Sequence, residues 1–428
     1  MKYILPVIVN LFFIKASFSQ NIRCATDILV SQREQSDSTY AGRLDETYKQ
    51  ISQAANHSAL HRSGEIKRIP VVVHVVYNND EQNVSDELVL DQIETLNRDY
   101  RRKNADTTLT RAIFSPVAGD AGIEFFLAEW DPQGLPTNGI TRTQTDVATF
   151  INFSFDLTLM KTASTGGADA WPVSKYLNIW VCNMAIPILN VPFILGFATP
   201  PDGAPNWPAG SSAEQPQYDG VVVHYEVFGS HPDATGPLAT TNRGRTATHE
   251  VGHYLGLRHI WGDGQGADVC VVDDGIDDTP KAAAANQQTC DYLANSCQEG
   301  SEDLPDMLEN YMDYSDENCL NMFTKQQISA MHYVLDNFRQ DLLVAGENSP
   351  SAETGLRLYP NPASTILTIK NELIQGNAFS FSIYQADGTC VMKGASSDRL
   401  DISGLSCGLY SLVINDNARF FSGRFIKD

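Results

Sequence analysis

The chain has 428 residues, a formal net charge of −22 and 42% hydrophobic residues. The hydrophobic content is ordinary for a globular protein, but the length exceeds one ordinary core, so we expect two or three domains. The negative charge disfavours nucleic acid and anionic membranes as partners, and favours cations, basic peptides and hard metal ions.

Segment 1–19 has the pattern of a secretory signal peptide. Lys2 supplies a positive start, an apolar stretch follows, and Ser17 and Ser19 are small residues placed for cleavage before Gln20. The alternative, a short membrane anchor, is less favoured because the apolar stretch is too short to span a bilayer. We therefore expect an exported protein without a transmembrane segment, in a compartment where disulfides can form.

Residues 20–68 are polar and poor in large apolar groups, which indicates a pro-segment or a tail rather than a domain. Residues 69–344 combine buried-strand patterns with amphipathic helices, so the fold class that we expect there is α/β (α+β). One helix is predicted to follow Ser85 as its N-cap, and another to span roughly 243–255. Strands are predicted in "RIPVVVHVVYN", "GIEFFLAEW", "GITRTQ", "YLNIWVCNM" and "DGVVVHYEVF", and a last helix in "TKQQISAMHYVLDNFRQDLL".

The segment "HEVGHYLGLRH" has the spacing of a catalytic zinc site. On a helix, His249 and His253 present both imidazoles on one face, while Glu250 points to the neighbouring side. Gly256 accepts the left-handed conformation that ends a helix, so the chain can turn back and bring His259 round as a third ligand. Three protein ligands leave a fourth position for water, as in catalytic zinc sites. The alternative is a helix that merely carries satisfied histidines.

HExxHxxGxxH is also the signature of the metzincin metalloproteases, and the chain resembles them further on. "ENYMDYSDENC" is similar to their methionine turn, with Met312 beneath the metal and Tyr314 two residues later. With "GRTATHEVGHYLGL", "NIWVCNM" and "DTP", it resembles the pappalysin family over about residues 65–343. The resemblance implies an α/β catalytic domain split by a horizontal cleft, and a role for Tyr314 in steadying the reaction intermediate.

The signal peptide, the ligand set and the pappalysin resemblance together predict a secreted zinc endopeptidase. Zinc would acidify a water molecule and polarise the scissile carbonyl, and Glu250 would move the proton of that water to the leaving amine. The competing hypothesis is a catalytically silent surface adhesin or binding protein on a metzincin scaffold. The intact Glu250 argues against it, because a silent scaffold needs no general base.

Of the eight cysteines, four follow the histidine motif and permit three disulfide pairings, among which spacing does not choose. A closed four-thiolate zinc site is the alternative, but an oxidising compartment disfavours it. The pappalysin resemblance implies Cys270–Cys297 and Cys290–Cys319. Cys182 lies in an apolar strand and is expected to be a buried thiol, and the pairing of Cys390 and Cys407 stays open.

"VVDDGIDDTP" gathers carboxylates at 273, 274, 277 and 278 with Thr279. Hard oxygen ligands in a loop suit calcium, although composition alone favours a solvated acidic turn. The resemblance implies a structural calcium ion held by Asp274, the carbonyl of Asp277, and Thr279.

Cys24, in "IRCATD", is a free thiol close to the predicted start of the exported chain. A thiolate is a strong zinc ligand and could fill the open position of the metal as a latency switch. Some pappalysins have a similar "RC" followed by small residues. The alternatives are a lipid-modified or simply unpaired cysteine, and Gln20–Arg23 stand between the cleavage point and the thiol.

Residues 345–353 have the composition of a linker, and residues 354–428 change to short alternating strands, which predicts a small all-β sandwich. "YPNP" and "ISGL…GLY" resemble the C-terminal sorting domain of the type IX secretion system. The resemblance implies bacterial secretion machinery as a partner, and a secreted or cell-surface protein exported through the periplasm and outer membrane. The alternative is a carbohydrate- or protein-binding sandwich.

In the pappalysins, an acidic residue five places after the turn methionine reaches the pocket for the side chain just after the scissile bond. Here that residue is Glu317, where relatives usually carry aspartate. Carboxylates pair well with guanidinium, so the resemblance implies a preference for arginine, then lysine, and self-cleavage before Arg62 or Arg68. The alternative is that Glu317 points to solvent and Asp316, or nothing, sets the preference.

Overall fold

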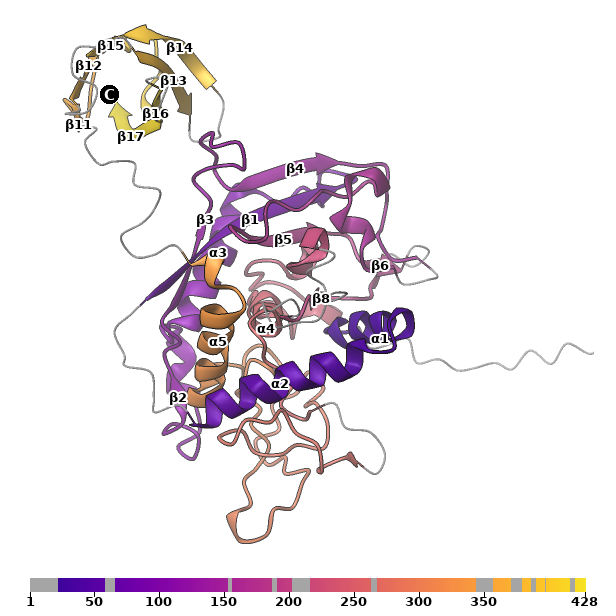
Figure 1. The fold of residues 1–428 in the computed structure, drawn as a ribbon. Helices are drawn as coiled ribbons and strands as arrows, with labels where there is room; N and C mark the ends of the chain where they lie inside the picture. The colour runs from indigo at the N-terminus through magenta and orange to yellow at the C-terminus, as the bar shows by residue number, and fades with distance from the viewer. Residues whose placement is uncertain are drawn as a thin grey trace, which may run out of the picture.

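The computed structural model describes residues 22–57, 66–152, 156–186, 191–201, 216–262, 268–343, 357–370, 379–385, 390–396, 398–415 and 420–428. The predicted signal peptide and linker lie outside the described residues. Figure 1 shows a large mixed body of strands and helices and a smaller, all-strand body at the C-terminal end.

The large body is built on a sheet with the order β3-β1-β5-β9-β8, in which β4 also pairs with β1. β1 runs parallel to β3, β4 and β5, β5 runs parallel to β9, and β8 alone is antiparallel to its neighbour. The edge beside β8 is therefore the one place where the sheet reverses direction. The strands are β1 (Lys67–Tyr77), β3 (Ile123–Leu127), β4 (Ile140–Gln144), β5 (Leu177–Cys182), β8 (Gly196–Ala198) and β9 (Val221–His224).

The predicted strands are present, and β8 is an addition that the sequence did not indicate. The apolar run of β1 is buried over eight consecutive residues, as expected for a central strand covered on both faces. His74 within it is a buried core histidine whose ring nitrogens contact Thr141 and Asn178. Cys182 is a buried free thiol, also as expected.

Two helices pack against this sheet, α3 (Asp86–Tyr100) and α4 (Arg245–Tyr254), and α5 (Lys325–Asn337) contributes to the same core. Ser85 caps α3 by accepting a hydrogen bond from the amide of Leu88, which confirms the predicted N-cap. Tyr100 at the end of α3 donates a 3.1 Å hydrogen bond to the carbonyl of Thr248, so α3 fixes the position of α4. One continuous core of sheet and helix side chains lies between them.

Residues 22–57 do not form a loose tail. They contain two helices, α1 (Thr26–Ser36) and α2 (Tyr40–His57). Ile51 and Ala55 of α2 belong to the main core, and Ala25 and Leu29 belong to a second core beside β8. In Figure 1, α2 crosses the molecule between the sheet above and the loop-rich segment below.

The segment after α4 has little regular structure and is cross-linked. Disulfides join Cys270 to Cys297 and Cys290 to Cys319, the pairing that the pappalysin resemblance implies. Short two-stranded contacts complete the body: β2 (Ala118–Gly119) with β10 (Phe323–Thr324), and β6 (Ala185–Ile186) with β7 (Val191–Pro192).

The C-terminal body is a sandwich of two antiparallel sheets around its own core, as expected. One sheet has the order β11-β12-β15 and the other β14-β13-β16-β17. Its strands are β11 (Arg357–Tyr359), β12 (Ile366–Lys370), β13 (Phe379–Gln385), β14 (Cys390–Ser396), β15 (Arg399–Asp401), β16 (Gly408–Asn415) and β17 (Phe420–Lys427). Cys390 and Cys407 are both free thiols in the structure.

Candidate metal centre

Helix α4 carries the first two histidines on one buried face. His249 and His253 are each 2% exposed, although they lie in a helix with a polar sequence. The helix ends at Tyr254, and Gly256 follows with φ +88°, the left-handed conformation predicted from the sequence. The amide of Leu257 then bonds back to the carbonyl of Gly252 at 3.0 Å, which reverses the chain and brings His259 to the site.

The three imidazoles meet through their Nε2 atoms. His253 Nε2 lies 3.1 Å from that of His249 and 3.0 Å from that of His259. The Nδ1 atoms of His249 and His253 lie 2.7 Å from the Tyr311 carbonyl and 2.8 Å from the Leu257 carbonyl. Donation to these carbonyls assigns the proton to Nδ1 and leaves an Nε2 lone pair on each ring facing the centre.

This donor set fits a metal ion. Burial and the two neighbouring imidazoles lower the pKa of His249 well below its usual value, which keeps the ring neutral. Converging lone pairs repel one another unless a cation lies between them, and neutral imidazole suits zinc. Together with Cys24 Sγ, the histidine ligand atoms all lie within 4.8 Å of one another.

Glu250 is fully buried beside these rings. Its Oε2 lies 3.3 Å from Cys24 Sγ, and its Oε1 accepts no hydrogen bond from the described residues. Burial raises the pKa of Glu250 to about 8, partly offset by hydrogen bonds from Cys24 and Thr26. Strand β8 passes so close that a Cβ on Gly196 would lie 2.7 Å from Glu250 Cγ, so this position requires glycine.

Met312, the residue that the resemblance assigns to the methionine turn, packs against helix α4. Met312 is fully buried, and its Sδ would lie 2.4 Å from a Cβ on Gly252, so the glycine allows the turn to pack directly against α4. Tyr314 points its hydroxyl at His259, with 3.1 Å between the oxygen and Nε2. Trp261 stacks on the His259 ring with 4.3 Å between ring centroids, and it also contacts the ring of Tyr314.

The N-terminal segment reaches the same centre. Ile22 pairs in parallel with Ile194, and the amide of Ala25 donates to the carbonyl of Gly196 at 2.9 Å. This pairing carries Cys24 to the three histidines, where the thiol is buried and unpaired with another cysteine. Burial, then the charges of Glu250 and Asp27, raise the pKa of the Cys24 thiol well above its usual value.

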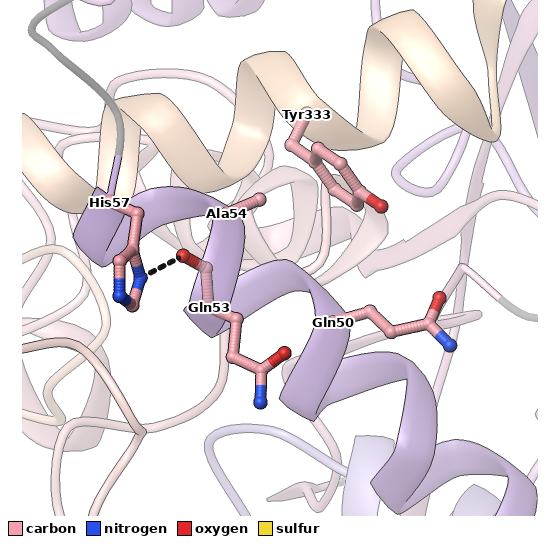
Figure 2. Close-up of a pocket in the computed structure, with 5 residues that line it drawn as sticks. All are labelled: Gln50, Gln53, Ala54, His57 and Tyr333. Carbon is pink, nitrogen blue, oxygen red and sulfur yellow. Dashed lines mark hydrogen bonds between the residues drawn. The ribbon is translucent and has the colours of Figure 1, made fainter.

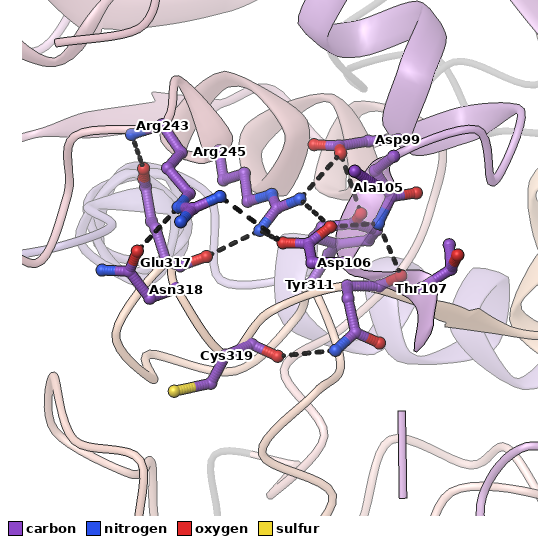
Figure 3. Close-up of polar contacts among 12 residues, drawn as sticks. Asp99, Ala105, Asp106, Thr107, Arg243, Arg245, Tyr311, Glu317, Asn318 and Cys319 are labelled. Atoms are coloured by element: carbon purple, nitrogen blue, oxygen red, sulfur yellow. Dashed lines mark hydrogen bonds and ion pairs between the residues drawn. The ribbon is translucent and has the colours of Figure 1, made fainter. Parts of the chain in front are cut away.

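Glu317 lies in a buried polar network next to α4 and is fully buried, so the alternative in which it points to solvent is wrong. Arg23 extends to it: the guanidinium lies 3.7 Å from Oε1 and donates to the carbonyls of Tyr314 at 3.0 Å and Ser315 at 2.5 Å. Sequence reasoning missed Arg23, although its position directly before Cys24 was a usable signal. Figure 3 shows the other side of this network, with Arg243 and Arg245 between Glu317 and Asp106.

The acidic loop has one buried carboxylate with unused capacity. Asp274 Oδ1 accepts from the Thr279 hydroxyl at 2.7 Å and the Ile276 amide at 3.1 Å, while its buried Oδ2 accepts nothing from the described residues. Burial raises the pKa of Asp274 well above its usual value. Asn56 of α2 contacts the same loop, donating to the carbonyl of Gly275 and accepting from the amide of Asp277.

Figure 2 shows a different hollow, between α2 and Tyr333 of α5, with Gln50, Gln53 and His57 on its wall. The described residues place no group of metal ligands there.

In the part of the chain that the structure describes, no helix has both the length and the apolarity to cross a bilayer.

Comparison with known families assigns both bodies. The family model described as pregnancy-associated plasma protein-A matches residues 162–336, and that of a secretion system C-terminal sorting domain matches residues 357–428. An extracellular metalloprotease of Arthroderma benhamiae is 24% identical over 348 residues, which cover 80% of this chain and 96% of that protein. Another, from Arthroderma otae, is 30% identical over 244 residues, which cover 51% of this chain and 76% of that protein.

Solved structures give the same assignment. Mature mirolysin of Tannerella forsythia, in complex with a cleaved peptide, is 42% identical with a TM-score of 0.57, covering 66% of this chain and 97% of that chain. A mutant of promirolysin from the same organism is 39% identical with a TM-score of 0.63, covering 75% of this chain and 97% of that chain. The match to a precursor extends the similarity to a zymogen, and the sorting domain indicates a secreted or cell-surface location. The chain therefore belongs to the pappalysin family of metallopeptidases.

Proposed function

We propose that the chain is the precursor of a zinc-dependent endopeptidase in which His249, His253 and His259 bind the metal and Glu250 is the general base. The observation that carries the proposal is the convergence of three buried imidazole Nε2 atoms, with neighbouring nitrogens 3.0–3.1 Å apart, beside a buried carboxylate. Membership of a metallopeptidase family supports this reading over a silent adhesin.

The mechanism assigns each step to a group of this chain. When bound, zinc supplies Lewis acidity that polarises the scissile carbonyl and acidifies water. Glu250 takes the proton of the attacking water at its carboxylate and returns it to the leaving amine. The Tyr314 hydroxyl donates a hydrogen bond to the negative oxygen that develops on the substrate carbonyl.

The test is Glu250→Gln, which keeps the shape of the side chain and removes the base. We expect kcat on casein or a quenched peptide to fall by about 10²–10⁴-fold, while one zinc ion per chain remains by elemental analysis. Glu94→Gln, at an exposed position on α3, is the matched control and should leave both values unchanged. A Glu250→Gln enzyme with normal turnover would remove Glu250 from the mechanism.

We further propose that Glu317 directs the enzyme to arginine, then lysine, just after the scissile bond. The support is that this chain already places an arginine there: Arg23 meets Glu317 and two carbonyls of the methionine-turn segment while Cys24 reaches the metal ligands. A buried carboxylate with adjacent carbonyl oxygens suits the planar guanidinium, which offers five donors. Asp316, the alternative, instead accepts local hydrogen bonds from the backbone amide and the side chain of Asn318.

Glu317→Gln tests this preference without changing the size of the side chain. Loss of one partner of a buried charge pair costs about 2–5 kcal/mol, so cleavage before arginine should fall steeply relative to cleavage before leucine. A peptide-library profile of the cleavage products measures the ratio directly. A wild-type profile without enrichment of arginine or lysine would refute the preference.

Two further assignments accompany the zinc site. Cys24 would hold the precursor latent by occupying the position of the attacking water. A structural calcium ion would bind Asp274, the carbonyl of Asp277, and Thr279, and the unused Asp274 Oδ2 supports it. Of the two predicted maturation points, the bond before Arg68 lies inside strand β1, where Arg68 pairs with Glu124 of β3. Cleavage there would cut a strand of the central sheet. Arg62, the other predicted point, lies outside the described residues.

A further inference from the structure

Glu317 is held at four points in the described structure. Its backbone amide donates to the carbonyl of Thr240 at 2.9 Å, and its backbone carbonyl accepts from the Arg245 guanidinium at 2.7 Å. On the side chain, Oε2 accepts from the amide of Arg243 at 2.6 Å, and Oε1 accepts from the hydroxyl of Thr246 at 3.2 Å. Figure 3 shows Arg243, Arg245 and Asn318 gathered around this residue.

Thr246 is the one side-chain hydroxyl among these partners. It lies in the first turn of α4, three residues before His249, and is 1% exposed. Its acceptor, Oε1, is the same oxygen that faces the Arg23 guanidinium at 3.7 Å. The Thr246 hydroxyl therefore donates to the carboxylate oxygen that faces a bound guanidinium, whereas the Arg243 amide donates to the other oxygen.

We propose that Thr246 is a specificity-determining positioning residue: it aims Glu317 Oε1 at the guanidinium of the residue after the scissile bond. The proposal rests on the arginine preference argued above and extends it to the active-site helix. Arg245 supports the same arrangement, because Asp106 and Asp99 hold its guanidinium against the backbone of Glu317.

The physical reason is the length of the glutamate side chain. Glutamate has three rotatable side-chain bonds, and fixing them costs free energy at the moment of binding unless the protein has already fixed them. Two hydrogen bonds, one to each carboxylate oxygen, fix the plane of the carboxylate before a substrate arrives. Charge that is preorganised in a buried site discriminates more strongly between a cation and a neutral group than charge that must reorient.

The experiment compares two peptide substrates that differ only in charge after the scissile bond: arginine and its neutral isostere citrulline. It uses the full chain, loaded with zinc and activated by removal of its pro-segment. Thr246→Val removes the hydroxyl at nearly constant volume. We expect the ratio of kcat/KM for arginine over citrulline to fall about tenfold, the scale of one hydrogen bond to a charged group.

Ser329→Ala is the control on another helix, α5. Ser329 is also buried, and its hydroxyl donates to the carbonyl of Lys325 at 3.1 Å, outside the network around Glu317. A loss that is merely structural should lower activity on both substrates in either variant and leave the ratio unchanged. The pair Thr246→Ser and Thr246→Ala differs by a single oxygen atom and serves if the valine variant does not fold: serine should keep the ratio and alanine should lose it.

The possible outcomes distinguish the role of Thr246 from the arginine preference on which it depends. A wild-type enzyme that cleaves arginine and citrulline peptides equally well would overturn the arginine preference and, with it, the role of Thr246. A wild-type enzyme that prefers arginine, with an unchanged ratio in Thr246→Val and Thr246→Ala, would overturn the role of Thr246 alone.

Discussion

Two consecutive residues, Arg23 and Cys24, lie at the two places where the proposed mechanism requires a substrate. Arg23 meets Glu317, and Cys24 Sγ lies among the three converging histidines, 3.3 Å from Glu250. A charged anchor and a soft metal ligand on adjacent residues reinforce each other, because once one is bound the other is held at high local concentration. Sequence reasoning singled out the thiol as a candidate ligand but not the arginine directly before it.

Cys24→Ala should produce a precursor that cleaves a short quenched peptide without prior processing. The alanine removes the sulfur that would occupy the water position, so water and a short peptide compete with a segment that has lost one of its two anchors. The measurement is the initial rate of peptide cleavage. A gel run alongside verifies that the precursor is still intact. Cys407→Ala, at an exposed free cysteine of the C-terminal body, is the control and should stay latent. A latent Cys24→Ala precursor would contradict the switch.

Lys161 is a buried amine that the catalytic proposal does not use. Its Nζ donates to the Tyr218 carbonyl at 2.7 Å and lies about equally far from the rings of Trp180 and Phe197, 5.1 and 5.0 Å from their centroids. Burial lowers the pKa of Lys161 to about 7. The unfolded chain holds its proton up to a pH of about 10.4, so it binds more protons than the folded chain between pH 7 and 10. The contribution of Lys161 to stability therefore improves as the pH rises through this window.

Lys161→Met should raise the melting temperature at pH 6, where the folded protein must bury the charged amine, because methionine fills the same space without a charge. The advantage over wild type should shrink by pH 9, where the wild-type amine is neutral. Thermal melts of both proteins across this range measure the difference in melting temperature. The pH dependence that comes from all other ionisable groups is the same in both proteins and drops out of this difference. Lys175→Met, at an exposed position, should show no such trend. An advantage that is constant with pH would argue against a buried charge.

At the scale of elements, the sequence predicted those parts whose pattern is local. The helix before Gly256, the cap at Ser85 and the buried run of β1 all follow from periodicity or from one residue's backbone preference. α1 could not be predicted in the same way, because its sequence is polar and few of its residues are buried. Strand β8 has three residues, too few for a pattern, yet it forms the wall beside Glu250.

The acidic loop supports an element-scale prediction. Asp274 is buried with one free carboxylate oxygen, and an unpaired buried charge is costly unless a cation compensates it. Adding calcium to zinc-loaded protein should raise the melting temperature by mass action, since the ion binds only the folded loop. Asp274→Asn should abolish this response, whereas Asp291→Asn, in the neighbouring exposed loop, should keep it. Equal melting temperatures of wild type with and without calcium would remove the site.

At the scale of the whole molecule, the chain divides into two bodies that share no described core. The core clusters of the metallopeptidase body together draw on residues from Ile22 to Leu343, and the cluster of the C-terminal sandwich draws on residues from Leu358 to Phe425. The N-terminal helices, by contrast, contribute to the cores of the body that they cover. Their removal on activation should expose apolar surface, whereas removal of the C-terminal sandwich should not.

Deletion of residues 354–428 should therefore separate export from catalysis. The cut falls after the last described core residue of the metallopeptidase body, so we expect the truncated protein to fold and keep its zinc content. It lacks the sorting domain matched at 357–428, so in a host with the secretion system it should accumulate in the periplasm instead of the medium. Cell fractionation with an antibody against the metallopeptidase body measures the distribution, and a full-length Glu250→Gln chain controls for effects of lost activity. Normal secretion of the truncated chain would contradict sorting by this domain, and loss of zinc would show that the two bodies depend on each other for folding.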